Sequence, residues 1–425
     1  MMRRILLLCL LTLSAAVSAQ PEEHFQITRL ADDLLMLSTD QGRYSNNSLV
    51  FTGPQGLLLV DTHGRDDATA LKAYVDGLGL GEPKYIINTH RHVEHIGGNH
   101  LFGAAPTVVT HKLFPEKLRS GTFLFAEYPP EAFPDITFED SLEINFNNEI
   151  IRLVNIGGSH DDNEIMVFFT RHGIAHVSSV VNGFNFPSVD SDGDVMQFEP
   201  RVRQLMDLLP ADTQLVSGHN GQANGFDFIG RGDQLEAYAD MMKNTVTIAR
   251  DQLAQGKTGE DMVEAGVFDE YEQYAGSYVT TDEWVEYVVA ALTGTRETRD
   301  DICKPVYKAW KHDGAQAAVD LYRELLEKEP QKYDFQPYTL LAIGSQLLGN
   351  EKYADAVTFL LGSRATYPDS EYGYYTHYLA AKALQRLGHT GEAIDQVRMS
   401  LQLNADFASA SELLGELNGS LDEKS

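Results

Sequence analysis

Cysteine is almost missing from this chain of 425 residues, which contains only Cys9 and Cys303. Cys9 lies in an apolar N-terminal stretch that we expect to be removed, so the mature chain would keep a single thiol. A disulfide within the mature chain is therefore excluded. Because 43% of the residues are hydrophobic, a core large enough to fold without disulfides is nevertheless available.

Positive charge is also scarce. Lys and Arg number 33 against 62 Asp and Glu, which leaves a formal net charge of −29. Such a field repels a phosphate backbone, so nucleic acid is a poor candidate ligand. No apolar run reaches the roughly 20 residues that a membrane-spanning helix needs, and we expect no stable membrane insertion.

The N-terminus has the pattern of a secretory signal peptide. Arg3 and Arg4 precede an apolar run from Ile5 to Leu13, and small residues follow as far as Ala19. This pattern predicts cleavage near Ala19. An exported protein with a full-sized core and no disulfide is typical of the bacterial periplasm, so we expect a periplasmic or secreted protein.

The remaining chain changes character twice. Up to about residue 219, short β-branched and aromatic runs such as 56–61 and 85–89 suit strands. Helical stretches interrupt these runs, which indicates a layered αβ core. Beyond residue 230, long helical patterns dominate. We therefore expect a signal peptide over 1–19, a domain core over 20–230, a helical extension of that domain over 231–300 and helical repeats over 301–425.

The repeats are indicated by helix pairs that each have a glycine at the turn and an alanine early in the second helix. The alanines recur every 37 or 38 residues, close to the period of about 34 in tetratricopeptide repeats, where small residues permit close helix crossing. We predict tetratricopeptide-like repeats that could recruit a protein partner, with a plain helical bundle as the alternative. The residues of the pattern are Gly314, Gly349, Gly388, Ala318, Ala356 and Ala393.

Side chains that bind metals are concentrated directly after the predicted strand 85–88. His90, His92, Glu94 and His95 stand within six residues there. Imidazole and carboxylate are ligands that zinc prefers, and one loop at a strand end can present several of them together. Two glycines follow at positions 97 and 98, and we expect them to permit a tight turn. The segment therefore predicts a zinc site.

This segment resembles the first metal motif, H-x-H-x-D-H, of the metallo-β-lactamase superfamily. The resemblance extends over about residues 25–296: 56–61 looks like the strand ending in Asp before the motif, 157–160 like the next histidine element, 186–190 like the segment after the bridging Asp, and 217–220 like the terminal G-H-G. It implies an α+β protein, in which a four-layer αβ/βα sandwich is followed by the all-α repeat region.

Residue by residue, the resemblance implies two neighbouring metal positions and one or two zinc ions per chain. One metal would be held by His90, His92 and His160. The other would be held by Glu94, His95 and His219. Asp61 would orient a ligand histidine rather than bind metal itself. Five further histidines match no motif position and are expected to be structural: His63, His100, His111, His172 and His176.

The sequence departs from the family pattern at three positions. Glu94 replaces an Asp, which keeps the charge and adds one methylene. Ser179 stands where the metal-bridging Asp belongs, and a neutral hydroxyl is a poor zinc ligand compared with a carboxylate. The second metal should therefore bind more weakly or not at all. Asn220 replaces the last glycine of G-H-G.

The resemblance implies a zinc-dependent hydrolase of a small-molecule substrate, with Glu94 as a catalytic residue. Zinc would lower the pKa of a bound water toward 7, and the hydroxide would attack an ester-, thioester-, lactone-, lactam- or phosphoester-type bond. The alternative, motivated by Ser179 and Glu94, is a catalytically impaired binding or scaffold protein whose repeats recruit a partner. The metal content of the mature protein would distinguish the two hypotheses.

Overall fold

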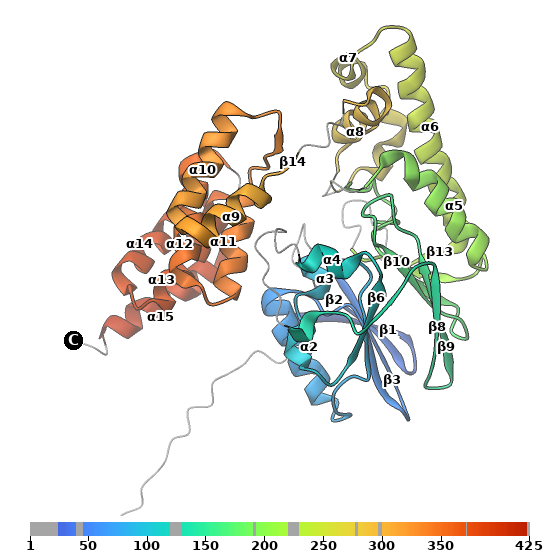
Figure 1. Ribbon diagram of the computed structural model, residues 1–425, viewed down its shortest axis with the longest axis horizontal. Helices are drawn as coiled ribbons and strands as arrows, with labels where there is room; N and C mark the ends of the chain where they lie inside the picture. Colours follow the sequence, from blue (N-terminus) through green and yellow to red (C-terminus); the bar gives the residue numbers. More distant parts are fainter. Residues whose placement is uncertain are drawn as a thin grey trace, which may run out of the picture.

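The computed structural model describes residues 24–39, 46–119, 130–189, 193–219, 229–276, 279–295, 300–370 and 372–422. The predicted signal peptide, 1–19, lies outside these residues. Two sheets with their helices make up the first part of the chain, and stacked helices make up the part after residue 300 (Figure 1). No helix in the described ranges is both long and apolar enough to cross a membrane.

The first sheet has seven strands in the order β1-β2-β3-β4-β5-β6-β7. Strands β1 to β4 pair in antiparallel fashion, whereas β4 to β7 are parallel neighbours. The parallel part brings the carboxyl ends of β4 and β5 to one edge. The strands are β1 (Phe25–Ala31), β2 (Leu34–Thr39), β3 (Asn47–Gly53), β4 (Gly56–Val60), β5 (Tyr85–Ile87), β6 (Thr107–His111) and β7 (Ile136–Phe138).

The second sheet has six strands in the order β13-β12-β11-β10-β9-β8. Its strands are antiparallel except for the parallel pair β11 and β12. The strands are β8 (Ser141–Phe146), β9 (Glu149–Asn155), β10 (Ile165–Phe169), β11 (Ile174–His176), β12 (Gln214–Val216) and β13 (Ile229–Arg231). Strand β13 crosses the boundary that we placed at residue 230.

Alternation along the strands creates the layers. In β3, Leu49 and Phe51 join a core shared with Leu153 and Phe169 of the second sheet, whereas Val50 points to the opposite face and packs with α2 residues. This is the period of two that a strand buried on both faces requires. The helices of this part are α2 (Arg65–Gly77), α3 (Val93–Ile96), α4 (Phe114–Arg119), α5 (Phe198–Leu208), α6 (Leu235–Ala254), α7 (Gly259–Glu264) and α8 (Thr281–Thr293).

Helices α5, α6 and α8 cover the outer face of the second sheet. In α5, Phe198, Val202 and Leu205 repeat at helical spacing and enter a core with Trp284 of α8. A capping box between Thr280 and Glu283 begins α8. The segment that we called a helical extension is thus the fourth layer, and the predicted αβ/βα sandwich followed by helices is confirmed.

The C-terminal part stacks helix pairs, as predicted. Gly314 and Gly388 have positive φ angles of 89° and 79° where α9 meets α10 and α13 meets α14. The three repeating alanines, Ala318, Ala356 and Ala393, are each 0% exposed. The tetratricopeptide identity stays a prediction. The helices are α9 (Cys303–Asp313), α10 (Ala315–Lys328), α11 (Thr339–Gly349), α12 (Tyr353–Thr366), α13 (Gly373–Arg386), α14 (Thr390–Leu403) and α15 (Ala408–Asp422).

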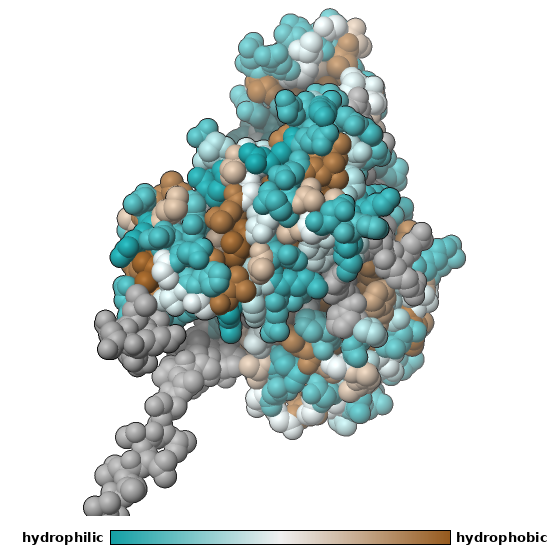
Figure 2. Space-filling model, turned by 60° about the vertical axis from the view of Figure 1, so that its left-hand side comes forward, coloured by the Kyte–Doolittle hydropathy of each residue, from teal (hydrophilic) through white to brown (hydrophobic). Residues whose placement is uncertain are grey.

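Two short strands interrupt the helical part, which the sequence did not lead us to expect. Strands β14 (Asp300–Asp301) and β15 (Tyr333–Asp334) form a parallel pair where the helical part begins. The backbone N–H of Asp300 donates to Lys332 O at 2.8 Å. On the face drawn in Figure 2, hydrophilic residues cover most of the described surface and hydrophobic ones gather in narrower strips.

Candidate metal centre

The predicted ligand loop leaves the carboxyl end of β5 and turns into the short helix α3. His92 is the N-cap of α3, with Glu94 in its first turn and His95 in its last. The glycines after the helix serve another purpose than we expected, because Gly97 and Gly98 have ordinary φ angles of −59° and −87°. A Cβ on Gly98 would lie 2.3 Å from Thr62 O, so close backbone approach requires glycine here.

Within the described parts of the chain, two groups have donor atoms that all lie within 4.8 Å of one another. The first contains His90, His92 and His160, all of them buried. Nε2 of His90 lies 3.0 Å from Nδ1 of His92, and Nε2 of His160 lies 3.4 Å from the same Nδ1. Residues 70 positions apart in the chain thus aim nitrogen atoms at one point.

The second group contains Glu94, His95 and His219. Nε2 of His95 lies 3.2 Å from Nε2 of His219. His219 follows β12 and is held near the first sheet, because its backbone forms an isolated bridge with Asn46. The longer carboxylate of Glu94 reaches the group while its side chain stays 36% exposed. The structure therefore brings together both sets of residues that the resemblance implied, whereas Asn220 lies outside the described residues.

Both groups fit a zinc ion. Two nitrogen ligands at about 2.0–2.1 Å from zinc and at a tetrahedral angle lie roughly 3.3 Å apart. The separations in the structure are 3.0, 3.4 and 3.2 Å. Nitrogens at such distances without an ion would either repel through their lone pairs or share a proton. The donor set, five imidazoles and one carboxylate, suits a transition metal, with zinc, copper, iron and nickel all compatible with imidazole ligands.

The outward nitrogens of these rings contact groups that orient them. Nδ1 of His95 lies 2.8 Å from Oδ2 of Asp61, a contact that the predicted orienting role of Asp61 would require. Nδ1 of His160 lies 2.9 Å from Ser188 O, and Nδ1 of His90 lies 3.3 Å from Ser178 Oγ. Carbonyl and carboxylate acceptors favour a proton on the outward nitrogen and leave the inward lone pair for a cation.

The electrostatics favour the protonation states that bind metals. Burial, followed by the charges of neighbouring histidines, holds the pKa of His90 well below 6.5, so this ring is neutral at pH 7. Burial alone would raise the pKa of Glu94, but the charge that His92, His95 and His219 carry when they are protonated at low pH lowers it to about 2, so the carboxylate is ionised at pH 7. Neutral imidazoles and an ionised carboxylate are the forms in which these side chains coordinate metals.

Ser179, which stands where the resemblance places a metal-bridging Asp, lies in a buried loop after β11. Its backbone N–H donates to Oε1 of Glu164 at 3.0 Å. Its hydroxyl is buried and contacts no hydrogen-bond partner in the described structure. Ser178 before it has a φ of 53°, a left-handed conformation that glycine adopts more easily.

Sequence reasoning missed two buried acids beside the groups. Burial, and then the nearby Asp161 charge, raises the pKa of Glu164 to about 8, although hydrogen bonds from Ser178 and Ser179 oppose the rise. Asp161 directly follows His160 and is 0% exposed. The position of Asp161 directly after a predicted ligand histidine was the signal in the sequence that could have identified it.

The five histidines expected to be structural lie outside both groups.

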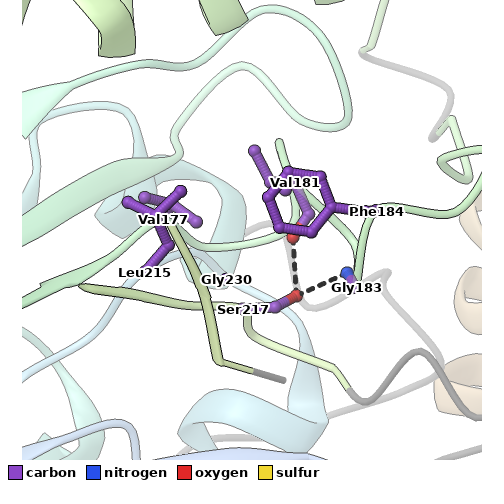
Figure 3. A pocket seen from close by; sticks show the side chains of 7 residues that line it. All are labelled: Val177, Val181, Gly183, Phe184, Leu215, Ser217 and Gly230. Atoms are coloured by element: carbon purple, nitrogen blue, oxygen red, sulfur yellow. Dashed lines mark hydrogen bonds between the residues drawn. The ribbon is translucent and has the colours of Figure 1, made fainter. Parts of the chain in front are cut away.

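A small apolar pocket lies between the loop after β11 and the end of β12 (Figure 3). The hydroxyl of Ser217 donates to Val181 O at 2.6 Å and accepts from Gly183 N at 3.0 Å, which ties the loop after β11 to the end of β12. A Cβ on Gly230 would lie 2.1 Å from the Phe184 ring, so glycine is required at this wall. The pocket is lined by Val177, Val181, Gly183, Phe184, Leu215, Ser217 and Gly230.

The fold and the two groups define an αβ/βα sandwich with two candidate metal sites. The family profile named Metallo-beta-lactamase superfamily matches residues 41–219, so this part of the chain is a metallo-β-lactamase superfamily domain. The match is shorter than the 25–296 over which we saw the resemblance, although α6 and α8 outside it complete the fourth layer.

Comparison with curated proteins gives no significant match. Among solved structures, the chain is similar to a metallo-beta-lactamase from Pontibacter korlensis, with a TM-score of 0.44 and 16% identity over 52% of this chain and 99% of that one. It is also similar to the DIM-1 metallo-beta-lactamase, with a TM-score of 0.42 and 16% identity over 52% of this chain and 98% of that one.

Proposed function

We propose that this protein is an exported, zinc-dependent hydrolase. The observation that carries the proposal is the pair of groups at one sheet edge, where His90, His92 and His160 adjoin Glu94, His95 and His219. Bound zinc would supply an activated water and electrophilic stabilisation of a developing oxyanion. The bond that is cleaved would be of the ester, thioester, lactone, lactam or phosphoester type.

Each part of the chain would have a defined role in this reaction. The three histidines of the first group would hold one ion through neutral nitrogens, and Asp61 would keep His95 turned toward the second position. A carboxylate with a pKa of about 2 is a weak base. Glu94 would therefore bind and orient as an anion rather than accept the proton from water at neutral pH.

The location and the repeats complete the proposal. A signal peptide ending near Ala19 would direct the protein to the periplasm or the exterior. The helix pairs after residue 300 would act as tetratricopeptide-like repeats and recruit a protein partner. The small buried alanines at the crossings, Ala318, Ala356 and Ala393, support this interpretation.

A second candidate is a scaffold protein that binds metal poorly and has lost catalysis. Ser179 favours it, because a hydroxyl at the bridging position removes one negative charge between two dications. The first group needs no residue from position 179, so we prefer the hydrolase with about one tightly bound zinc per chain.

Metal analysis and a substrate panel test the proposal together. We expect about one tight zinc in the dialysed protein and turnover of at least one substrate class. His92→Ala should abolish that turnover, since it removes a ligand of the first group. The matched control is His100→Ala, an exposed histidine in the short 3-10 helix Asn99–Phe102, which should keep activity. Turnover that survives His92→Ala would contradict the catalytic assignment, and metal-free, inactive wild type would favour the scaffold.

A further inference from the structure

A buried ion pair joins the two loops that carry the first group. Arg91 stands between His90 and His92, and Asp161 follows His160. Nε of Arg91 lies 2.9 Å from Oδ2 of Asp161, and the two side chains are 8% and 0% exposed. A surface pair would contribute little to stability. In a buried pair, by contrast, removing one partner leaves the other charge uncompensated, so the two loops depend on each other.

The same carboxylate oxygen faces a ligand ring. Oδ2 of Asp161 lies 3.6 Å from Nε2 of His92, just beyond hydrogen-bonding distance. The opposite ring atom, Nδ1 of His92, faces His90 and His160 inside the group. An anion beside Nε2 favours a proton there and leaves the Nδ1 lone pair directed into the group. Asp161 thus faces Nε2 of His92 as a neighbouring anion, whereas Asp61 lies within hydrogen-bonding distance of Nδ1 of His95.

We propose that Arg91 and Asp161 are positioning residues of the first group. Arg91 holds the Asp161 carboxylate against Nε2 of His92, and the carboxylate sets the orientation and tautomer of that ring. The inference deepens the proposed function because it concerns metal binding by the same group, but it requires no hydrolytic turnover.

The charge of Arg91 also reaches the C-terminal part of the chain. Burial raises the pKa of Asp301 in β14, and hydrogen bonds from Cys303, the charge of Lys304 and, to a lesser degree, the charge of Arg91 oppose that rise. Asp301 therefore lies within electrostatic range of the ligand loop.

Zinc affinity and the tautomer of His92 are the two measurements that test the proposal. The variants are Arg91→Met, Arg91→Lys, Asp161→Asn and the double variant Arg91→Met/Asp161→Asn. The matched control is Arg152→Gln, which removes an exposed pair with Glu143 of 3.0 Å between β9 and β8. Affinity for the first equivalent of zinc is measured by chelator competition, and ring ¹⁵N NMR of the metal-free protein reports the tautomer.

We expect Arg91→Met and Asp161→Asn each to weaken zinc binding about 10–100-fold. Arg91→Lys should recover part of the loss because it keeps the charge. The double variant should lose no more than the worse single variant, because both residues act through His92. The wild-type ring should carry its proton on Nε2, and Arg91→Met should shift the proton toward Nδ1. Arg152→Gln should change neither measurement.

Unchanged zinc affinity and an unchanged tautomer in folded Arg91→Met and Asp161→Asn would overturn the proposal. Circular dichroism checks folding, and Arg91→Lys and Asp161→Asn carry the comparison if Arg91→Met does not fold. A wild type that binds zinc but hydrolyses no substrate would remove the proposed function and leave this inference standing. If the wild type binds no zinc, the comparison of His92 tautomers in the metal-free proteins still tests whether Arg91 and Asp161 position this ring.

Discussion

Nδ1 of His95 lies 2.8 Å from Oδ2 of Asp61, although 34 positions separate the two residues in the chain. Asp61 also accepts from the backbone N–H of Thr89 at 2.8 Å and from its hydroxyl at 2.7 Å. One carboxylate at the end of β4 therefore holds both the start of the ligand loop and a ring of the second group. The pairing of β4 with β5 therefore helps to set the position of a ring in the second group.

Asp61→Asn should weaken zinc binding at the second group by about 10–100-fold, because the amide cannot supply the anionic acceptor that orients His95. Asn tolerates the positive φ of 59° at this position, so the backbone should survive the change. Isothermal titration with zinc measures the effect. Asp76→Asn, on the exposed face of α2, is the control, and equal affinities in both variants would contradict the role of Asp61.

Ser179→Asp should raise zinc affinity at the second group by about tenfold or more, since a carboxylate adds both a ligand and a charge between the two positions. Ser179→Asn has nearly the same size without the charge and should not raise the affinity. Competition titrations of the second zinc equivalent compare the three proteins. Equal gains from Asp and Asn would mean that charge at position 179 is irrelevant. The hydrolytic rate need not rise.

His172 should make stability depend on pH far from the metal groups. Burial would lower its pKa, but hydrogen bonds to Glu149 and Asp33 raise it above 6.5 overall. Because the folded value exceeds the unfolded one, the stabilisation is complete below about pH 6.5 and is lost as the pH rises through the folded value.

His172→Gln should therefore lower the melting temperature more at pH 6 than at pH 9. Thermal unfolding of the metal-free protein at both pH values checks this. His312→Gln, at an exposed position of α9, serves as the control. A loss from His172→Gln that is equal at the two pH values would show that packing against Phe51 and Phe169, rather than charge, is what His172 contributes.

The fragment 301–425 should fold by itself. Its two hydrophobic clusters contain only residues from 302 to 417, so its core needs no side chain of the sandwich. Each helix pair should be stabilised by its neighbours. Circular dichroism should show a helical fragment with a cooperative melt that added zinc does not change. An unfolded fragment would mean that the helical part needs the sandwich in order to fold.

Motif spacing and hydrophobic periodicity carried much of the prediction. The ligand residues of the first motif lie close together in the chain, so the sequence alone predicts that they bind a metal. Strand and helix patterns indicated the layers. A buried face places hydrophobic residues with a period of two in a strand and of 3.6 in a helix. The recurring alanines indicated helix pairs because close crossing tolerates only small side chains.

Tertiary structure alone decided what lies against these residues. The spacing of Arg91 and Asp161 in the sequence does not predict that they form an ion pair. The two residues meet because the packing of the two sheets brings their loops together. The same holds for Glu164 behind Ser179, and for Gly98, whose role is close approach to Thr62 rather than a turn. Residue types and their order determined which ligands this protein can offer. The pairing of two sheets determined which nitrogen of each ring faces the group, since that depends on the acceptor behind the ring.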